Sequence, residues 1–125
     1  MVLKISQKVN SFKDLEVWQL SHQLVLDVYK LIEEFPKQEE YRLTSQLVRA
    51  VISIPTNIAE GKGRSTIKDY LHFLIIARGS LEETKYLVLL SKDLNYVNTD
   101  KYTKLDEQLN LIGKKLNALI NALRK

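Results

Sequence analysis

The sequence of 125 residues contains no cysteine, so disulfides, thiolate metal ligands and a cysteine nucleophile are excluded. Only four glycines and two prolines interrupt it. No apolar run approaches the roughly 20 residues that span a bilayer, and the first residues lack the apolar segment of a signal peptide. We therefore expect a soluble, cytoplasmic protein that binds no membrane and whose core is held by packing alone.

The sequence also lacks a strong excess of one charge, because the formal net charge is only +4 and acidic and basic residues are interspersed. This balance favours acidic partners only mildly, so the position of each charge matters more than the sum. A chain of this length forms one hydrophobic core, which predicts a single domain.

Apolar residues recur at steps of three and four along most of the chain, as in amphipathic helices. Ser11 and Thr66 are candidate N-caps, and Pro36 stops the first helix. The predicted elements are a flexible tail at 1–11 and, within 12–125, helices at about 14–35, 40–61, 66–95 and 99–124. Similar helices joined by short loops predict an all-α, antiparallel up-and-down four-helix bundle.

The segment from Ser53 to Arg64 places Pro55 inside an apolar helical pattern. A proline there costs about 3 kcal/mol and predicts a bend. Gly61 is expected to end that helix, and Gly61 and Gly63 let the backbone approach a neighbour closely. The turn lacks the spacing of a nucleotide-binding loop.

Basic residues surround this turn. Lys62, Arg64 and Lys68 flank a predicted helix N-terminus, whose free N–H groups favour an anion such as a phosphate. The alternative is that they are solvated surface charges. Arg49, on the preceding helix, is suited to bidentate contact with a phosphate or a carboxylate.

Polar and charged residues continue the face of the second helix that carries Arg49. They are Arg42, Gln46, Ser53, Asn57 and Glu60. Their spacing places them on one side, which predicts either a solvated face or a hydrogen-bonded contact with a neighbouring helix or subunit.

The third predicted helix is apolar around most of its circumference, more than one buried stripe requires. We therefore expect self-association through this helix, the alternative being a more central position in the bundle. The predicted interface residues are Tyr70, Phe73, Leu74, Ala77, Tyr86 and Leu87. Gly79 permits close backbone approach, and we expect another helix to cross there.

Chemistry-bearing residues are few. His22 and His72 are the only histidines, and Asp69 with His72 is the only local carboxylate–histidine pair of the kind found in bundle metal sites. No nucleophile has a base and an orienting group near it in the pattern. We therefore expect no enzyme activity, no metal, no cofactor and no small-molecule substrate.

Taken in order, several motifs resemble the four-helix-bundle proteins encoded within intervening sequences of bacterial 23S ribosomal RNA genes. The motifs are Phe12 to Gln19, Phe35-Pro36 with Glu40-Tyr41, Ser53-Ile54-Pro55 through Arg64, and Tyr70, Phe73-Leu74 and Ala77 to Glu83. Arg42 departs from a frequent glycine, and Val48-Arg49 from a frequent Arg-Arg pair, which weakens the basic cluster on the second helix.

This resemblance implies a four-helix bundle. From relatives that include accessory proteins of diversity-generating retroelements, it also implies a ring-like homopentamer with a basic surface that binds nucleic acid and, in those relatives, a reverse transcriptase. The leading hypothesis is an oligomeric, non-enzymatic nucleic-acid-binding protein that contacts RNA through Arg49, Lys62, Arg64 and Lys68. The alternative is a protein-interaction scaffold or an accessory subunit of a nucleic-acid enzyme such as a reverse transcriptase.

Overall fold

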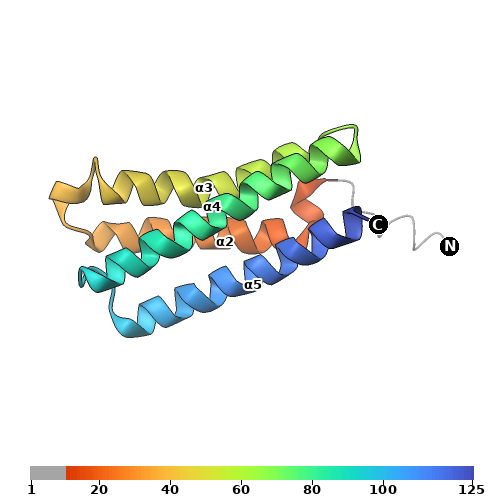
Figure 1. Cartoon of the computed structure of the whole chain (residues 1–125). Helices are drawn as coiled ribbons and strands as arrows, with labels where there is room; N and C mark the ends of the chain where they lie inside the picture. Colours follow the sequence, from red (N-terminus) through yellow and green to blue (C-terminus); the bar gives the residue numbers. More distant parts are fainter. Residues whose placement is uncertain (1–10) are drawn as a thin grey trace.

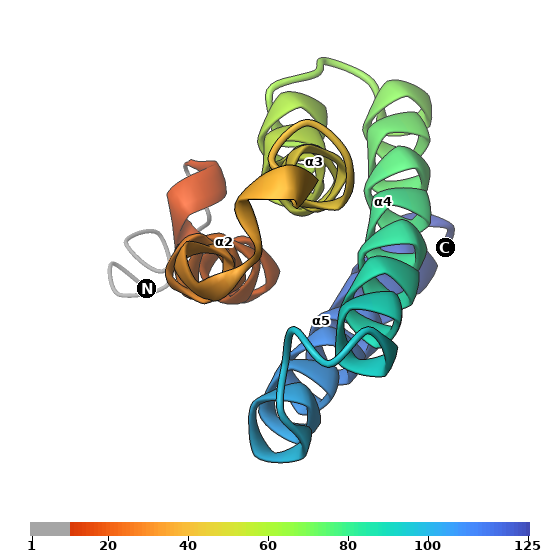
Figure 2. The ribbon, with the colours of Figure 1, turned by 90° about the vertical axis from the view of Figure 1, so that its left-hand side faces the viewer.

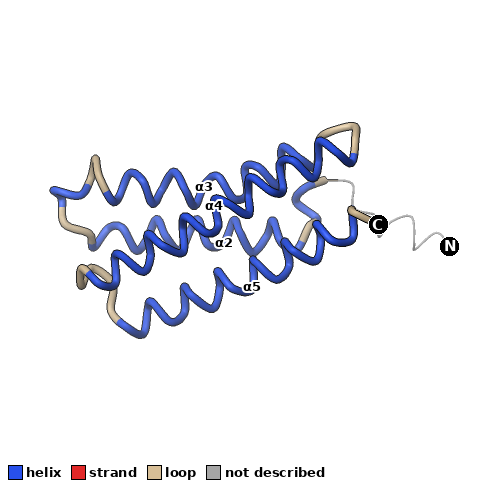
Figure 3. Tube along the Cα trace, viewed as in Figure 1, coloured by secondary structure: helices blue, strands red, loops and turns tan. Residues whose placement is uncertain are grey.

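The computed structural model describes residues 11–125, and within that range the secondary structure is helical, without strands (Figure 3). The long helices are α2 (Glu16–Leu31), α3 (Leu43–Lys62), α4 (Ile67–Asp93) and α5 (Thr99–Leu123). Short 3-10 turns precede and follow α2, namely η1 (Phe12–Asp14), η2 (Ile32–Glu34) and η3 (Lys37–Glu39). The chain is thus an all-α helical bundle.

The four long helices surround one core (Figure 2). Helix α3 packs against α2 and α4, and α5 packs against α4 and α2. In Figure 1 the loop between α3 and α4 lies at the same end as the C-terminus, and the other two loops lie at the opposite end. We call these the α3–α4 end and the α2–α3 end.

The core is built from the apolar stripes that the sequence shows. On α5 the buried residues are Leu105, Leu109, Ile112, Leu116 and Ile120. Their steps of three and four are those of helices that pack nearly parallel to one another. Each such side chain contributes roughly 1.5–3 kcal/mol when it is removed from water. Packing therefore sets which helix faces remain free for a site.

The first helix is shorter than its pattern predicts. Leu15 has an extended backbone (φ −78°, ψ 125°), which separates η1 from α2. Ser11 caps η1 instead of the long helix, and Asp14 completes a capping box with it. The stripe continues across this break because the 3-10 turn keeps Phe12 against Trp18, with ring centroids 4.9 Å apart.

The second helix begins at Leu43, three residues later than predicted. The carboxylate of Glu39 accepts a hydrogen bond from the Tyr96 hydroxyl (2.8 Å), pairs with Arg42 (3.2 Å), and interacts with the backbone N–H of Leu43 at the start of the helix. At its other end, the prediction that Gly61 ends the helix is wrong. The helix runs on through Lys62, and Gly63 is the C-cap.

Gly61 instead lies buried against α4. A Cβ atom built there is 3.0 Å from Phe73 Cβ and from Tyr70 Cδ1, and 3.2 Å from the carbonyl oxygen of Tyr70. Two of these atoms belong to or adjoin the backbone and have little room to move. Glycine is thus required so that α3 and α4 can approach closely next to their loop.

Candidate nucleic-acid interface

Three of the predicted cationic residues lie in the loop between α3 and α4 or in the helix turns next to it. Thr66 caps α4, and its Oγ1 accepts a hydrogen bond from the backbone N–H of Asp69 (3.1 Å). The side chains of Lys62 and Lys68 form no hydrogen bond or ion pair within residues 11–125. The structure therefore brings two uncompensated lysines to one corner of the bundle.

Arg64 is held in place at the same corner. Its Nη2 lies 3.1 Å from Glu60 Oε2, and its guanidinium carbon lies 4.6 Å from the centre of the Phe73 ring. The carboxylate offsets part of the charge, whereas the ring fixes the direction of the guanidinium. Arg64 is thus oriented by its neighbours, and Lys62 and Lys68 supply the net positive charge.

Arg49 does not join this corner. It lies 13 residues before Lys62 on α3, which is about 20 Å along the helix. It lines a separate hollow of about 590 Å³ between α3 and α4. The hollow is bordered by Tyr41, Arg42, Ser45, Gln46, Arg49, Ala50, Ser53, Ser80 and Glu83.

Beside this hollow, the polar face of α3 makes a hydrogen bond to α4. The hydroxyls of Ser53 and Ser80 hydrogen bond across the helix pair at 2.8 Å, and Asn57 Nδ2 donates to Ser53 Oγ at 2.9 Å. Part of the face is therefore a contact with a neighbouring helix. Arg49 and Glu83 form no ion pair within the described chain, so both signs of charge are open to solvent.

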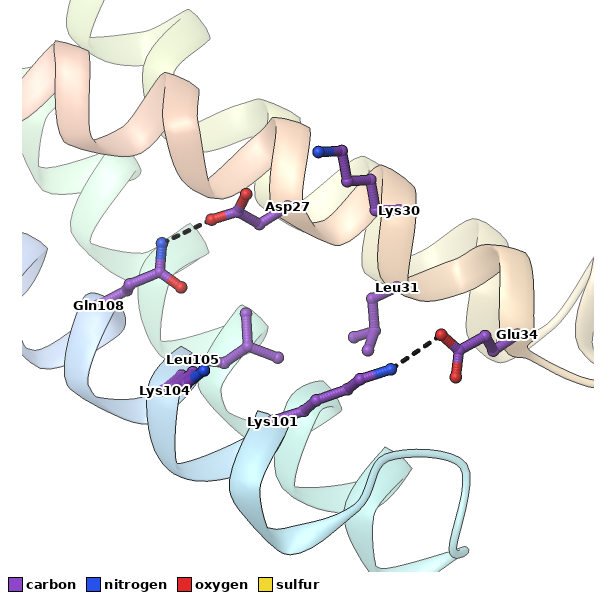
Figure 4. A pocket seen from close by; sticks show the side chains of 8 residues that line it. All are labelled: Asp27, Lys30, Leu31, Glu34, Lys101, Lys104, Leu105 and Gln108. Atoms are coloured by element: carbon purple, nitrogen blue, oxygen red, sulfur yellow. Dashed lines mark hydrogen bonds and ion pairs between the residues drawn. The ribbon is translucent and has the colours of Figure 1, made fainter.

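The opposite groove, between α2 and α5, is a different environment (Figure 4). Its volume is about 220 Å³, and Leu31 and Leu105 face into it. Two interhelix contacts cross it, Gln108 Nε2 to Asp27 Oδ2 at 2.9 Å and Lys101 Nζ to Glu34 Oε2 at 2.8 Å. These contacts join the helices, and the second one offsets the charge of Lys101.

Charge is unequally distributed between the two ends. Around the α3–α4 end the described basic residues are Lys13, Lys62, Arg64, Lys68, Arg124 and Lys125, and the acidic ones are Asp14, Glu16, Glu60 and Asp69. Around the α2–α3 end the basic residues are Lys30, Lys37, Arg42, Lys92 and Lys101, and the acidic ones are Glu33, Glu34, Glu39, Glu40, Asp93 and Asp100. The α3–α4 end is therefore the basic end.

The predicted interface on the third helix needs correction. Leu74, Ala77 and Leu87 are buried in the protomer's own core, because α4 packs against α3 on one side and α5 on the other. Two further residues, Tyr70 and Phe73, are partly buried, and burial raises the pKa of the Tyr70 hydroxyl. Of the six predicted residues, Tyr86 remains largely exposed, at 60%.

An apolar outer face of α4 nevertheless exists. It carries the exposed side chains of Ile75, Ile76, Tyr86 and Leu89. Gly79 lies in the middle of it, and a Cβ atom built there meets no atom within 4 Å. The expected helix crossing at Gly79 therefore does not occur within the protomer.

Residues 11–125 were also compared with the requirements of a metal site and of a membrane span. No cluster of three or more histidine and carboxylate side chains is arranged to hold a metal ion there. None of the described helices is long and apolar enough to cross a membrane.

Sequence reasoning missed a group of cations between α4 and α5. Arg78, Lys85 and Lys114 line a groove there, together with Glu82. The available signal was the charge of the last stretch of the chain, because no acidic residue follows Glu107.

Fold and site together define a class, an all-α helical bundle with one basic end and an apolar outer face on α4. The chain belongs to the family of 23S rRNA-intervening sequence proteins, which matches residues 13–118. It is similar to a crystal structure of a protein of unknown function from the S23 ribosomal protein family of Bacteroides thetaiotaomicron VPI-5482, with a TM-score of 0.75 and 25% identity. That similarity covers 83% of this chain and 97% of the other. Among curated proteins, none matches the chain.

Proposed function

We propose that the protein is a non-enzymatic, cytoplasmic, oligomeric nucleic-acid-binding protein that contacts RNA through its basic end. The observation that carries this proposal is the pair of uncompensated lysines, Lys62 and Lys68, beside the oriented guanidinium of Arg64. Lysine ammonium groups and a fixed guanidinium are the groups that contact phosphate oxygens.

Phosphate contacts of this kind carry no sequence information. Phe73 is covered by Arg64 and is partly buried, so it offers little ring surface on which a base could stack. Binding should therefore depend on salt much more than on sequence.

Self-association is the second part of the proposal. The outer face of α4, with Ile75, Ile76, Tyr86 and Leu89 around Gly79, is an apolar surface that a second copy would cover. The short loops and their placement in Figure 1 support the antiparallel up-and-down order. A ring-like pentamer would gather a charge of about +20 from five copies of +4.

The oligomer is tested by light scattering after size-exclusion chromatography. The wild type should elute as an assembly at micromolar concentration, and Ile75→Glu with Tyr86→Glu should elute as a monomer with unchanged helical content. A monomeric wild type would exclude self-association as a part of the function.

The RNA site is tested with Lys62→Glu and Lys68→Glu together. We expect affinity for a structured RNA in low salt to fall by about tenfold or more, because two attractive charges become repulsive. The matched control is Lys30→Glu with Lys104→Glu, two lysines of the α2–α5 groove that also form no ion pair (Figure 4). Equal losses in both double variants would exclude a site at the basic end.

One observation favours a second candidate, a scaffold or an accessory subunit of a nucleic-acid enzyme such as a reverse transcriptase. The hollow around Arg49 offers an unpaired cation and, in Glu83, an unpaired anion, which suits the mixed charges of a protein surface better than a polyanion. A partner that stays bound after nuclease treatment, and is lost with Arg49→Glu, would favour this candidate.

A further inference from the structure

The groove between α4 and α5 brings together basic residues that lie far apart in the sequence. It encloses about 460 Å³ and lies on the other side of α4 from the hollow around Arg49. Its border is formed by Arg78, Leu81, Glu82, Lys85, Asn110, Gly113, Lys114 and Asn117. Three cations and one carboxylate thus share one surface depression.

The pairing of these cations leaves most of their charge uncompensated. Arg78 Nη1 donates to the amide oxygen of Asn117 at 3.1 Å, a neutral partner that orients the guanidinium without cancelling its charge. Lys85 Nζ pairs with Glu82 Oε2 at 3.2 Å, and Lys114 forms no ion pair within residues 11–125. The groove therefore offers one oriented guanidinium and one free ammonium group.

Position 113 in the groove is a glycine, which lets Leu81 pack closely against α5. A Cβ atom built there would lie 3.3 Å from Leu81 Cδ2, tighter than an ordinary contact. The amide groups of Asn110 and Asn117 border the same space; Asn110 Nδ2 already donates to Asp106 Oδ2 (3.3 Å), whereas the Asn117 amide can still donate hydrogen bonds. Acceptor oxygens in the groove can thus meet amide donors as well as the cations.

The basic character of the groove continues along the chain. From Gln108 onward α5 and the residues after it contain Lys114, Lys115, Arg124 and Lys125, and no aspartate or glutamate. Lys115 pairs with Glu16 at 3.1 Å, on the side of α2. The segment ends at the same end of the bundle as the loop between α3 and α4 (Figure 1).

The distance along α4 suits an extended polyanion. From Lys68 to Lys85 the helix rises by about 26 Å. A nucleic-acid strand in a duplex advances about 3.4 Å per phosphate, so several phosphates lie along this length. A small anion would need one pocket, whereas these cations are spread along α4, with Lys68 turned by about 100° around the helix from Lys85.

We propose that the α4–α5 groove binds the phosphate backbone of a nucleic-acid strand, with Arg78 and Lys114 as the principal contacts. This inference rests on the proposed nucleic-acid binding and extends it from the basic end to the middle of the bundle. None of the residues that border the groove is aromatic, so it reads no base. Affinity for unrelated sequences of equal length is therefore the same.

The test removes charge without adding acid. Arg78→Gln with Lys114→Gln is compared with the wild type for binding of a labelled 20-nucleotide RNA over a range of salt. We expect affinity near physiological salt to fall about tenfold, and the slope of log affinity against log salt to decrease by about 1.5, since each phosphate that the variant no longer neutralises lowers the slope by somewhat less than one. Lys114→Gln alone keeps the Arg78–Asn117 hydrogen bond and should give about half of that change in slope.

Two further variants separate this proposal from the one on which it rests. Lys30→Gln with Lys104→Gln changes the net charge equally and should leave the slope unchanged. If Lys62→Gln with Lys68→Gln weakens binding and the groove variants do not, the groove proposal is overturned and the function stands. If the wild type binds no RNA, the proposed function fails as well. Competition by polyglutamate as effective as competition by RNA would instead assign the groove to an acidic protein.

Discussion

The two ends of the bundle differ in the contacts that individual charged side chains make. At the α2–α3 end, Glu39 accepts a hydrogen bond from Tyr96 and pairs with Arg42, and Glu34 pairs with Lys101. At the α3–α4 end, Lys62 and Lys68 have no partner within the described chain. Charges that join loops to helices act on the stability of the fold, whereas charges left without partners are available to a ligand.

Packing differs between the two ends as well. The α2–α3 end is closed by side chains, with the Phe35 and Tyr96 rings 5.5 Å apart beside the buried Glu39. The α3–α4 end is closed by backbone, since Gly61 lets α3 lie against Tyr70 and Phe73. The position of the basic loop therefore depends on one residue without a side chain.

The largest expected effect is that of Gly61→Val, which should lower the free energy of unfolding by about 3 kcal/mol. Its Cβ would lie 3.0 Å from Phe73 Cβ and 3.2 Å from the Tyr70 carbonyl oxygen, so the two helices must separate at the basic end. The measurement is denaturant unfolding followed by circular dichroism.

Gly79→Val is the matched control, because its added atoms start from open space on the outer face of α4. It should cost less than about 1 kcal/mol, or gain slightly, since glycine itself disfavours a helix interior. Both variants are compared at a protein concentration where the wild type is monomeric. Equal losses would show that close approach at Gly61 does not hold the basic end.

The second prediction asks whether RNA binding follows the local charge of an end or the total charge of the protein. Glu33→Lys with Asp93→Lys replaces two negative charges by two positive ones and so raises the net charge by about 4 at the α2–α3 end, where neither residue forms an ion pair within the described chain. The ends are roughly 30 Å apart. The Debye length is about 8 Å at physiological salt. Affinity at physiological salt should therefore rise less than about threefold.

This variant is measured beside Lys62→Glu with Lys68→Glu, which changes the total charge by the same amount in the opposite direction. An increase at the α2–α3 end as large as the loss at the basic end would mean that RNA responds to total charge. In that case the difference between the two ends would carry no functional meaning.

The sequence predicted the helices and the cations of the basic end because both are local patterns. A stripe at steps of three and four needs no knowledge of distant residues, and neither does a cap such as Thr66. It did not predict that Glu39 would meet Tyr96, 57 residues later, or that Arg78 would meet Asn117, 39 residues later. Those contacts depend on which helix lies beside which, and so do the grooves that they border.

For α4 the sequence pattern predicted an interface but did not place its residues correctly. Its apolar circumference predicted an interface, but the pattern did not say which apolar residues serve the protomer and which remain outside. Contact with two neighbouring helices buries Leu74 and Leu87 and leaves Ile75 and Tyr86 exposed. A helix with two intramolecular neighbours needs a wide apolar surface before any second copy is considered.

The smallest expected effect tests the α2–α3 end through Tyr96→Phe. Removing the hydroxyl takes one hydrogen bond from the Glu39 carboxylate and should lower the melting temperature at pH 7 by about 3 °C. The matched control is Tyr102→Phe, because Tyr102 contacts Lys92 through its ring and its hydroxyl forms no hydrogen bond within residues 11–125. This second variant should melt like the wild type.

The loss of stability in Tyr96→Phe should depend on pH. The hydrogen bond from Tyr96 and the charge of Arg42 lower the pKa of Glu39 below its usual value of 4.5. A carboxylate whose folded-state pKa is lowered stabilises the protein above its unfolded-state pKa, and that contribution disappears as pH falls through the folded-state value. The difference between wild type and Tyr96→Phe should therefore be constant from pH 7 to about pH 5.5 and shrink below about pH 4.5. A difference that persists unchanged at about pH 3 would mean that the hydroxyl stabilises the α2–α3 end through packing and not through the carboxylate, and the contrast between the ends would then not be one of charge.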